Sequence, residues 1–211
     1  MPLYKTITVS PSTEVLIWKI TESYEELSAG VDLTENCQDR VDCMKSDLHR
    51  RGFISVRHLL KVKGYTDFDL FYDPKGKPHL KDGKHISITH SYIFSAIIIS
   101  DVKVGVDIEK QRTKILKIAH KFTPIEEYRT LANEDALIRK LTMVWGAKES
   151  LYKSFATPGV RFLEHIYVED FRLDDADSIA TVSAFDKTQA YTVSFMEMEQ
   201  FTLVYAIIKD E

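Results

Sequence analysis

Cysteine is nearly absent from this sequence, which has only Cys37 and Cys43 among its 211 residues. The two lie close together in a polar stretch, and neither their number nor their spacing fits a disulfide framework or a zinc site. Reduced thiols are the rule in the cytosol. We therefore expect both cysteines to be unpaired.

Long apolar runs are missing as well. The longest, around Ile97–Ile99, is far shorter than the ~20 residues that cross a bilayer as a helix. The first residues are polar and alternating, without the apolar stretch of a secretory signal. The sequence predicts a soluble, cytoplasmic protein with no membrane partner.

A large surplus of charge of either sign is also absent, since the formal net charge is −4. This balance shows no nucleic-acid footprint, so we expect no nucleic-acid partner, and any phosphate site must be built from local basic residues. The sequence contains no glycine-rich phosphate loop, no G-x-S-x-G turn and no H-E-x-x-H helix. These absences remove several common enzyme classes.

What is present is an even mixture of helix and strand signals. Apolar alternation and short apolar runs predict strands at 4–9, 15–20, 68–72, 86–89, 94–100, 104–109, 166–171, 179–185, 191–196 and 201–208. Helical spacing predicts helices at 21–30, 46–63, 114–121, 125–131 and 135–155. A turn is predicted at 73–78. The order favours an α+β fold with two comparable halves, 1–104 and 105–211.

The segment Val104–Glu109 carries the first candidate site. Alternate side chains of a strand point to opposite faces, so Asp107 and Glu109 share one face. Two neighbouring carboxylates repel unless a cation lies between them, and ligand sets made only of oxygen suit Mg²⁺. The alternative is a solvated strand face with two surface acids.

The segment Trp145–Lys153 carries the second candidate site. On a helix, Trp145, Glu149 and Lys153 lie at i, i+4 and i+8 and share a face. Glu149 could supply a third carboxylate and Lys153 a phosphate partner. The alternative is an ordinary surface ion pair between them, beside a core tryptophan. Gly146 costs about 1 kcal/mol inside a helix, which suggests that another group approaches the backbone there.

A third candidate is Thr89-His90-Ser91 at the end of a strand, with Lys77 in the turn before it. A hydroxyl, an imidazole and an ammonium near one another are suited to binding phosphate. The alternative is a histidine that is structural or merely exposed.

Taken in order, five motifs resemble the 4′-phosphopantetheinyl transferase superfamily, and its larger pseudo-dimeric type most of all. They are Gly76-Lys77-Pro78, Ile86–Ser91, Gly105–Glu109, Phe122–Glu126 and Trp145–Lys153. The resemblance implies two similar α+β halves related by pseudo-twofold symmetry, with the active site in the cleft between them. It departs from the family pattern in Thr89, where serine is usual, and in a glycine element reduced to Pro158-Gly159-Val160.

The resemblance also implies roles for individual residues. It implies a Mg²⁺ held by three carboxylates, Asp107, Glu109 and Glu149. It implies contacts to the phosphates of coenzyme A from five side chains, Lys77, Thr89, His90, Lys148 and Lys153. Structural support is implied for Phe122 and Glu126. One of Arg50, Arg51 and Arg57 is a further candidate for the nucleotide, with an exposed helical arginine as the alternative for each.

The implied reaction transfers the phosphopantetheine of coenzyme A to a serine of an apo acyl or peptidyl carrier protein, as in holo-acyl-carrier-protein synthases. Glu149 is the candidate base for the serine proton, and Lys153 the candidate for stabilising phosphate charge. Two alternatives stay open: another Mg²⁺-dependent enzyme that hydrolyses pyrophosphate or phosphodiester bonds, and a carrier-binding module without activity. The two fused halves would make a monomer sufficient.

Overall fold

Helices and strands are both well represented in the computed structural model, which describes residues 3–124 and 133–209. The predicted α+β class is confirmed. The chain divides into two units, Met1–Asp101 and Val102–Glu211, which we call unit 1 and unit 2. The boundary predicted after residue 104 would fall inside the first strand of unit 2. The pseudo-twofold symmetry stays a prediction.

Unit 1 contains a four-stranded antiparallel sheet with the order β1-β2-β6-β5. Its strands are β1 (Leu3–Ser10), β2 (Thr13–Lys19), β5 (His85–Ser91) and β6 (Phe94–Ser100). Strand β6 is buried along its whole length, as expected from its nearly continuous apolar sequence. Two further short strands, β3 (Leu70–Tyr72) and β4 (Pro78–Leu80), form a hairpin around the predicted turn.

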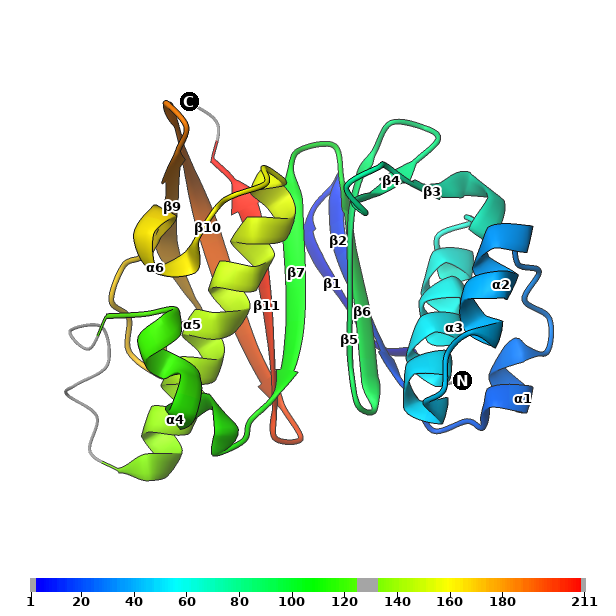
Figure 1. Ribbon diagram of the computed structural model, residues 1–211, viewed down its shortest axis with the longest axis horizontal. Helices are drawn as coiled ribbons and strands as arrows, with labels where there is room; N and C mark the ends of the chain where they lie inside the picture. The colour runs from blue at the N-terminus through cyan, green and yellow to red at the C-terminus, as the bar shows by residue number, and fades with distance from the viewer. Residues whose placement is uncertain (1–2, 125–132, 210–211) are drawn as a thin grey trace. The chain divides into compact units, whose positions relative to one another are not determined.

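The helices of unit 1 lie on one side of its sheet (Figure 1). They are α1 (Tyr24–Ser28), α2 (Glu35–Asp42), α3 (Asp47–Val62) and the 3₁₀ helix η1 (Asp67–Asp69). Helix α3 begins after Ser46, whose side chain accepts the backbone N–H of His49 and caps the helix. Its apolar residues, including Phe53 and Leu59, pack with Leu16 and Ile97 of the sheet to form the core.

Unit 2 contains a five-stranded antiparallel sheet with the order β7-β11-β10-β9-β8. Its strands are β7 (Val104–Lys110), β8 (Ile166–Val168), β9 (Asp177–Ala184), β10 (Lys187–Met198) and β11 (Phe201–Ile208). The last four strands follow one another as a meander, and β7 joins the sheet beside β11. The site described below depends on this placement of β7.

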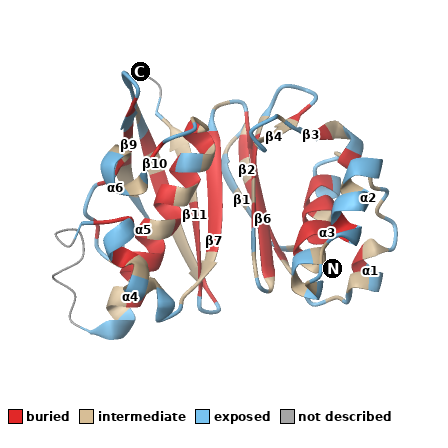
Figure 2. Ribbon diagram, viewed as in Figure 1, coloured by how far each residue is buried: buried red, intermediate tan, exposed pale blue. Residues whose placement is uncertain are grey.

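The long helix of unit 2, α5 (Glu134–Phe155), lies across this sheet (Figure 1). It is capped by Asn133 and ends at Ala156 in a left-handed conformation, just before the predicted break at Pro158-Gly159. Its buried residues, such as Leu141 and Leu151, pack on Val193 and other strand residues to form the core. Figure 2 shows this buried band along α5 and the strands beneath it. Among the described residues of unit 2, the other helices are α4 (Lys114–Ile118), η2 (Ala119–Lys121) and α6 (Phe162–His165).

Two α-helices were not predicted from the sequence, α2 and α6, and the 3₁₀ helix η1 replaces the start of the strand predicted at 68–72. Helix α2 is polar and buries only Val41, and α6 has only four residues, so neither carries the strong apolar pattern by which helices are found in a sequence. The helix predicted at 125–131 lies outside the described residues. Both cysteines are free thiols, as predicted. None of the helices in the described parts of the chain is both long and apolar enough to cross a membrane.

Candidate active site

Two glycines let α5 approach the sheet of unit 2 closely. A Cβ atom on Gly105 of β7 would lie 1.8 Å from the carbonyl oxygen of Ser150 on α5, and one on Gly146 would lie 2.7 Å from Cγ2 of Val204 on β11. Neither position therefore has room for a side chain. The Ser150 hydroxyl donates to the Val204 carbonyl at 3.0 Å and ties the helix to the sheet. The close approach predicted at Gly146 is confirmed.

The polar face of α5 is the one predicted from its sequence. Trp145, Glu149 and Lys153 are half-buried, whereas most other residues between 141 and 155 are buried. Their spacing brings them to one side of the helix. Because the helix approaches β7 so closely, this side faces the carboxylates of that strand.

Asp107 and Lys153 form an ion pair between β7 and α5. The Lys153 ammonium donates to Oδ1 of Asp107 at 2.7 Å and to the Val106 carbonyl at 2.9 Å. Asp107 is only 5% exposed, so the alternative of a solvated strand face is wrong. The alternative of a surface pair between Glu149 and Lys153 also fails, because the ammonium reaches across to β7.

Glu109 shares this face of β7 and has an aromatic partner. The indole N–H of Trp145 donates to its carboxylate, and the guanidinium of Arg112 and the ammonium of Lys153 are close enough to favour its charge. These groups lower its pKa, but burial first and then the charge of Asp107 raise it, and the net pKa is above the usual value. Carboxylates thus repel one another here despite nearby cations.

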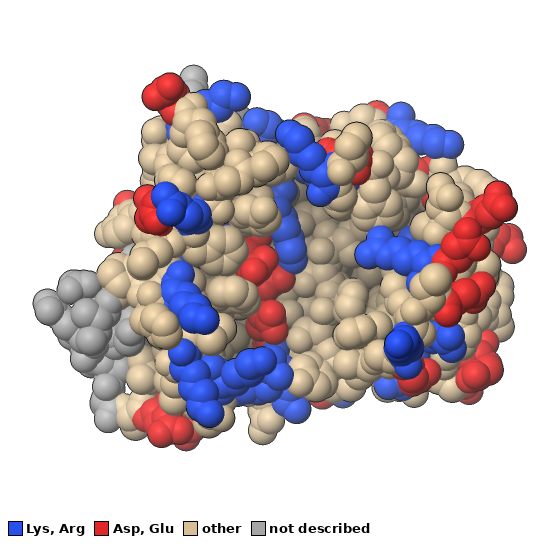
Figure 3. Space-filling view, viewed as in Figure 1, with Lys and Arg blue, Asp and Glu red and all other residues tan. Residues whose placement is uncertain are grey.

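The pKa of Glu149 is raised more strongly than that of Glu109. Burial and the charges of Asp107 and Glu109 raise its pKa to about 7, although Lys153 acts in the opposite direction. Three carboxylates from two elements therefore interact, with one ammonium bound among them. Figure 3 shows acidic side chains grouped on unit 2 along the line where α5 meets β7, with basic side chains beside them.

The carboxylates are not gathered around a common point. Within residues 3–124 and 133–209, no three His, Cys, Asp or Glu side chains are arranged closely enough to hold a metal ion. The donor set nevertheless suits Mg²⁺ in kind, because it consists of carboxylate oxygens whose repulsion a divalent cation would relieve. In this structure the Lys153 ammonium supplies part of the positive charge that relieves this repulsion.

A cavity of about 150 Å³ opens beside Glu109 in unit 2. Its apolar wall includes Ile115, Ile118 and Trp145. Its remaining lining is mainly basic, with Lys110, Arg112 and Lys114. An anionic group in this cavity would lie beside these three cations and the Glu109 carboxylate.

Two residues near the site have other partners. Lys148 is fully buried, and its ammonium donates to the Phe162 carbonyl at 3.1 Å, at the start of α6. Its predicted contact with coenzyme A stays a prediction. Phe122 is buried and packs edge-on against Trp145, with ring centroids 5.0 Å apart, as structural support requires. Glu126 lies outside the described residues.

The predicted phosphate-binding residues belong to unit 1. His90 is exposed, Thr89 is buried, and consecutive residues of β5 point to opposite faces of the sheet. The structure therefore does not bring these two side chains to one face. Lys77 is half-buried in the predicted turn, where Asp73 accepts its backbone N–H at 3.0 Å.

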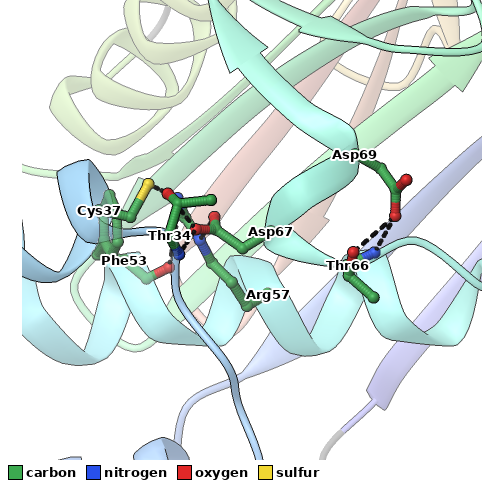
Figure 4. A network of polar contacts seen from close by, with 7 residues as sticks. All are labelled: Thr34, Cys37, Phe53, Arg57, Thr66, Asp67 and Asp69. Atoms are coloured by element: carbon green, nitrogen blue, oxygen red, sulfur yellow. Dashed lines mark hydrogen bonds and ion pairs between the residues drawn. The ribbon is translucent and has the colours of Figure 1, made fainter.

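Of the three candidate arginines, Arg57 is part of a buried network (Figure 4). It is 4% exposed, donates to Asp67 at 2.9 Å and to the Phe53 carbonyl at 3.1 Å, and contacts Cys37. Asp67 also accepts the N–H and the hydroxyl of Thr34. The network joins α2, α3 and η1, so Arg57 has a structural role.

The other two arginines have weaker local contacts. Arg50 donates to the Met44 carbonyl at 2.9 Å and lies over the Tyr24 ring, and Arg51 pairs with Asp47 one turn earlier. Both are half-buried, and both stay candidates for a nucleotide contact.

Sequence reasoning did not identify the roles of Gly105 and Trp145. A glycine inside a predicted strand is itself a signal of close backbone approach. The hydrogen bond from Trp145 to Glu109 has no comparable signal, because it joins residues far apart in the chain.

Comparison with known families gives a match in unit 2. The model of the 4′-phosphopantetheinyl transferase superfamily matches residues 103–206, which include all three carboxylates and Lys153. No curated protein matches the chain.

Proposed function

Because the chain belongs to the 4′-phosphopantetheinyl transferase superfamily, whose members transfer phosphopantetheine to carrier proteins, we propose that it uses coenzyme A as the donor and a serine of an apo acyl or peptidyl carrier as the acceptor. The observation that carries the proposal is that the charges of Asp107, Glu109, Glu149 and Lys153 act on one another inside the matched segment. Like charges held together in this way are typical of functional sites.

We assign Mg²⁺ to the three carboxylates, Asp107, Glu109 and Glu149. When bound, the ion would neutralise pyrophosphate charge and help to align the reacting groups. A cation held there would compete with the Lys153 ammonium for Asp107, and a displaced ammonium would be available to a phosphate oxygen. The assignment predicts that Mg²⁺ raises the melting temperature of wild type but not of Asp107→Ala, which is a test independent of activity.

In the reaction, the serine oxygen of the carrier attacks the β-phosphorus of coenzyme A. A new P–O bond forms to the serine, the bond to the bridging oxygen breaks, and adenosine 3′,5′-bisphosphate leaves. Glu149 takes the serine proton as general base. Lys153 donates hydrogen bonds to the phosphate oxygens, where negative charge increases as the bond breaks.

We assign the remaining phosphates of coenzyme A to Lys77, Thr89 and His90 of unit 1, and to Lys148. The support is the resemblance of their motifs to the family pattern and, for His90, its exposure. The three residues of unit 1 lie outside the matched segment 103–206. Replacing Lys77 or His90 by Ala should raise the KM for coenzyme A more than it lowers kcat. Unchanged KM in both variants contradicts this part of the proposal.

The decisive experiment is incubation with coenzyme A, Mg²⁺ and a panel of apo carriers, followed by intact-mass measurement of each carrier. We expect one phosphopantetheine group on at least one carrier and none in the presence of a chelator. Hydrolysis of coenzyme A without a carrier would instead support a hydrolase. Carrier binding without turnover would support a binding module. The identity of the carrier, the monomeric state and the cytoplasmic location stay predictions.

A further inference from the structure

The imidazole of His90 lies against the backbone of helix α3 at Gly52. A Cβ atom on Gly52 would lie 2.9 Å from Nδ1, 3.0 Å from Cγ and 3.4 Å from Cβ of His90. Contacts below 3.0 Å are not tolerated by real side chains, so at least the ring would have to move. Strand β5 brings His90 to this helix because Ile86 and Ile88, on the same face, pack in the core that α3 covers.

Space, and not backbone conformation, explains the glycine. Gly52 lies six residues into α3, without the positive φ that makes Gly30, Gly64, Gly76 and Gly83 of unit 1 difficult to replace. A glycine inside a helix is less favourable than alanine by about 1 kcal/mol. Helix α3 therefore carries a residue that weakens it at the point where the His90 ring lies.

The contact also sets the direction of the ring. The Nδ1 and Cγ atoms face α3, so the opposite edge, with Nε2, is turned away from the helix. His49 lies three residues before Gly52 on α3, and its ring centroid is 6.3 Å from that of His90, with the planes tilted by 55°. The His90 imidazole is thus bordered by the helix backbone and by a second ring.

We propose that Gly52 is a positioning residue, which holds the His90 ring so that Nε2 is presented to a phosphate of coenzyme A. The proposal rests on the proposed function, in which His90 binds that phosphate. A donor already held in its binding orientation loses less conformational entropy on binding than a mobile one. Substitution of Gly52 should therefore weaken binding of coenzyme A without affecting the chemical step.

The test is a double-mutant cycle with Gly52→Ala and His90→Ala, in which KM for coenzyme A, kcat and the melting temperature are measured. We expect Gly52→Ala to raise KM on the order of tenfold, the effect of weakening one hydrogen bond to a charged group, with kcat nearly unchanged. In the His90→Ala background the same change should leave KM as it is. Lys61→Ala, an exposed change near the other end of α3, is the control and should not alter KM.

The melting temperature supplies a second readout. Without the ring, alanine at position 52 should raise the melting temperature, because it favours the helix. With the ring present it should lower the melting temperature or leave it unchanged. If Gly52→Ala does not fold, the double variant should, and failure of this rescue overturns the proposal.

The remaining outcomes are distinct. Equal increases in KM from Gly52→Ala with and without the ring would overturn the positioning role. Unchanged KM in Gly52→Ala, with impaired His90→Ala, would do the same and leave the phosphate role intact. Unchanged KM in His90→Ala would contradict the proposed role of His90 itself.

Discussion

Each unit buries an aspartate beside a basic side chain, and the two pairs differ in their surroundings. In unit 1, Asp67 is 2% exposed and accepts hydrogen bonds from Arg57 and from Thr34 (Figure 4). In unit 2, Asp107 is 5% exposed and accepts from Lys153, but two further carboxylates lie close to it. One pair is surrounded by donors and the other by like charges.

The pKa values record this difference. Burial acts to raise the pKa of Asp67, but the Thr34 N–H and the Arg57 charge outweigh it, so the net pKa falls. Around Asp107 the balance is reversed, and the pKa values of Glu109 and Glu149 rise. Removing one partner from a network whose charges balance leaves a buried charge unpaired and is costly, whereas carboxylates held together in excess are typical of a site where a ligand supplies the missing charge.

The largest effect is expected from Arg57→Ala. The change leaves Asp67 buried without its counter-charge, which should destabilise the protein by about 3–5 kcal/mol. Chemical denaturation measures this loss. Arg50→Ala is the matched control, because its side chain is only half-buried and it should lose far less. A mild effect at Arg57 would mean that the unit 1 network contributes little to stability.

Next in size is the effect of Glu149 on transfer. Glu149→Gln keeps the shape but removes the base and one negative charge, so the rate should fall on the order of 10² or more. The exchange Glu149→Lys with Lys153→Glu should abolish transfer in a folded protein. Single-turnover transfer to an apo carrier measures both, with circular dichroism as the control for folding. A charge-exchanged enzyme with normal turnover would make both residues incidental to the reaction.

A smaller effect is expected when Asp107 is replaced, and the comparison with Asp67 tests directly whether the two aspartates have different roles. Asp107→Ala removes one of three like charges. The Lys153 ammonium then loses its partner on β7, but it still interacts with the Glu149 carboxylate on the same helix. In metal-free buffer this variant should be as stable as wild type or more so, and inactive. Asp67→Ala should be strongly destabilised. If Asp107→Ala unfolds, and folded wild type transfers without Mg²⁺, the site carboxylates are structural and the metal assignment is wrong.

The smallest expected effect is on the pH dependence of stability. The pKa of Glu149 is about 7 in the folded protein, against 4.5 for an ordinary glutamate. The contribution of Glu149 to the free energy of unfolding is therefore fully present below pH 4.5 and is lost as the pH rises through 7. In metal-free buffer the full shift would correspond to a fall in stability of about 3 kcal/mol over this range, and solvent screening of the partly exposed carboxylate should reduce it to about 1–2 kcal/mol. Glu149→Gln should lack that part of the decrease, and Mg²⁺ should reduce it in wild type. Identical pH profiles for wild type and Glu149→Gln would show that the carboxylate is not under repulsion.

The sequence alone predicted the elements whose pattern is strong. Strand β6, with its continuous apolar residues, and α5, with its clear period and its break at Pro158-Gly159, lie close to where they were expected. Strand and helix geometry predicted that Asp107 and Glu109 lie on one face of β7, and that Glu149 and Lys153 lie on one face of α5. Such predictions are possible because the side-chain periods of strands and helices are properties of the backbone. The polar helix α2 was missed, because its sequence is strongly polar and buries only Val41.

Only the tertiary structure decided which charges meet. Spacing along α5 suggested a pair between Glu149 and Lys153, but the glycines at 105 and 146 bring β7 so close that Lys153 reaches Asp107 instead. The sequence could not separate Arg57 from the other arginines, because its burial depends on Asp67 and on helices that fold over it. Local periodicity is encoded residue by residue, whereas burial and pairing of charges arise from contacts between distant segments, whose distances no single stretch of sequence specifies.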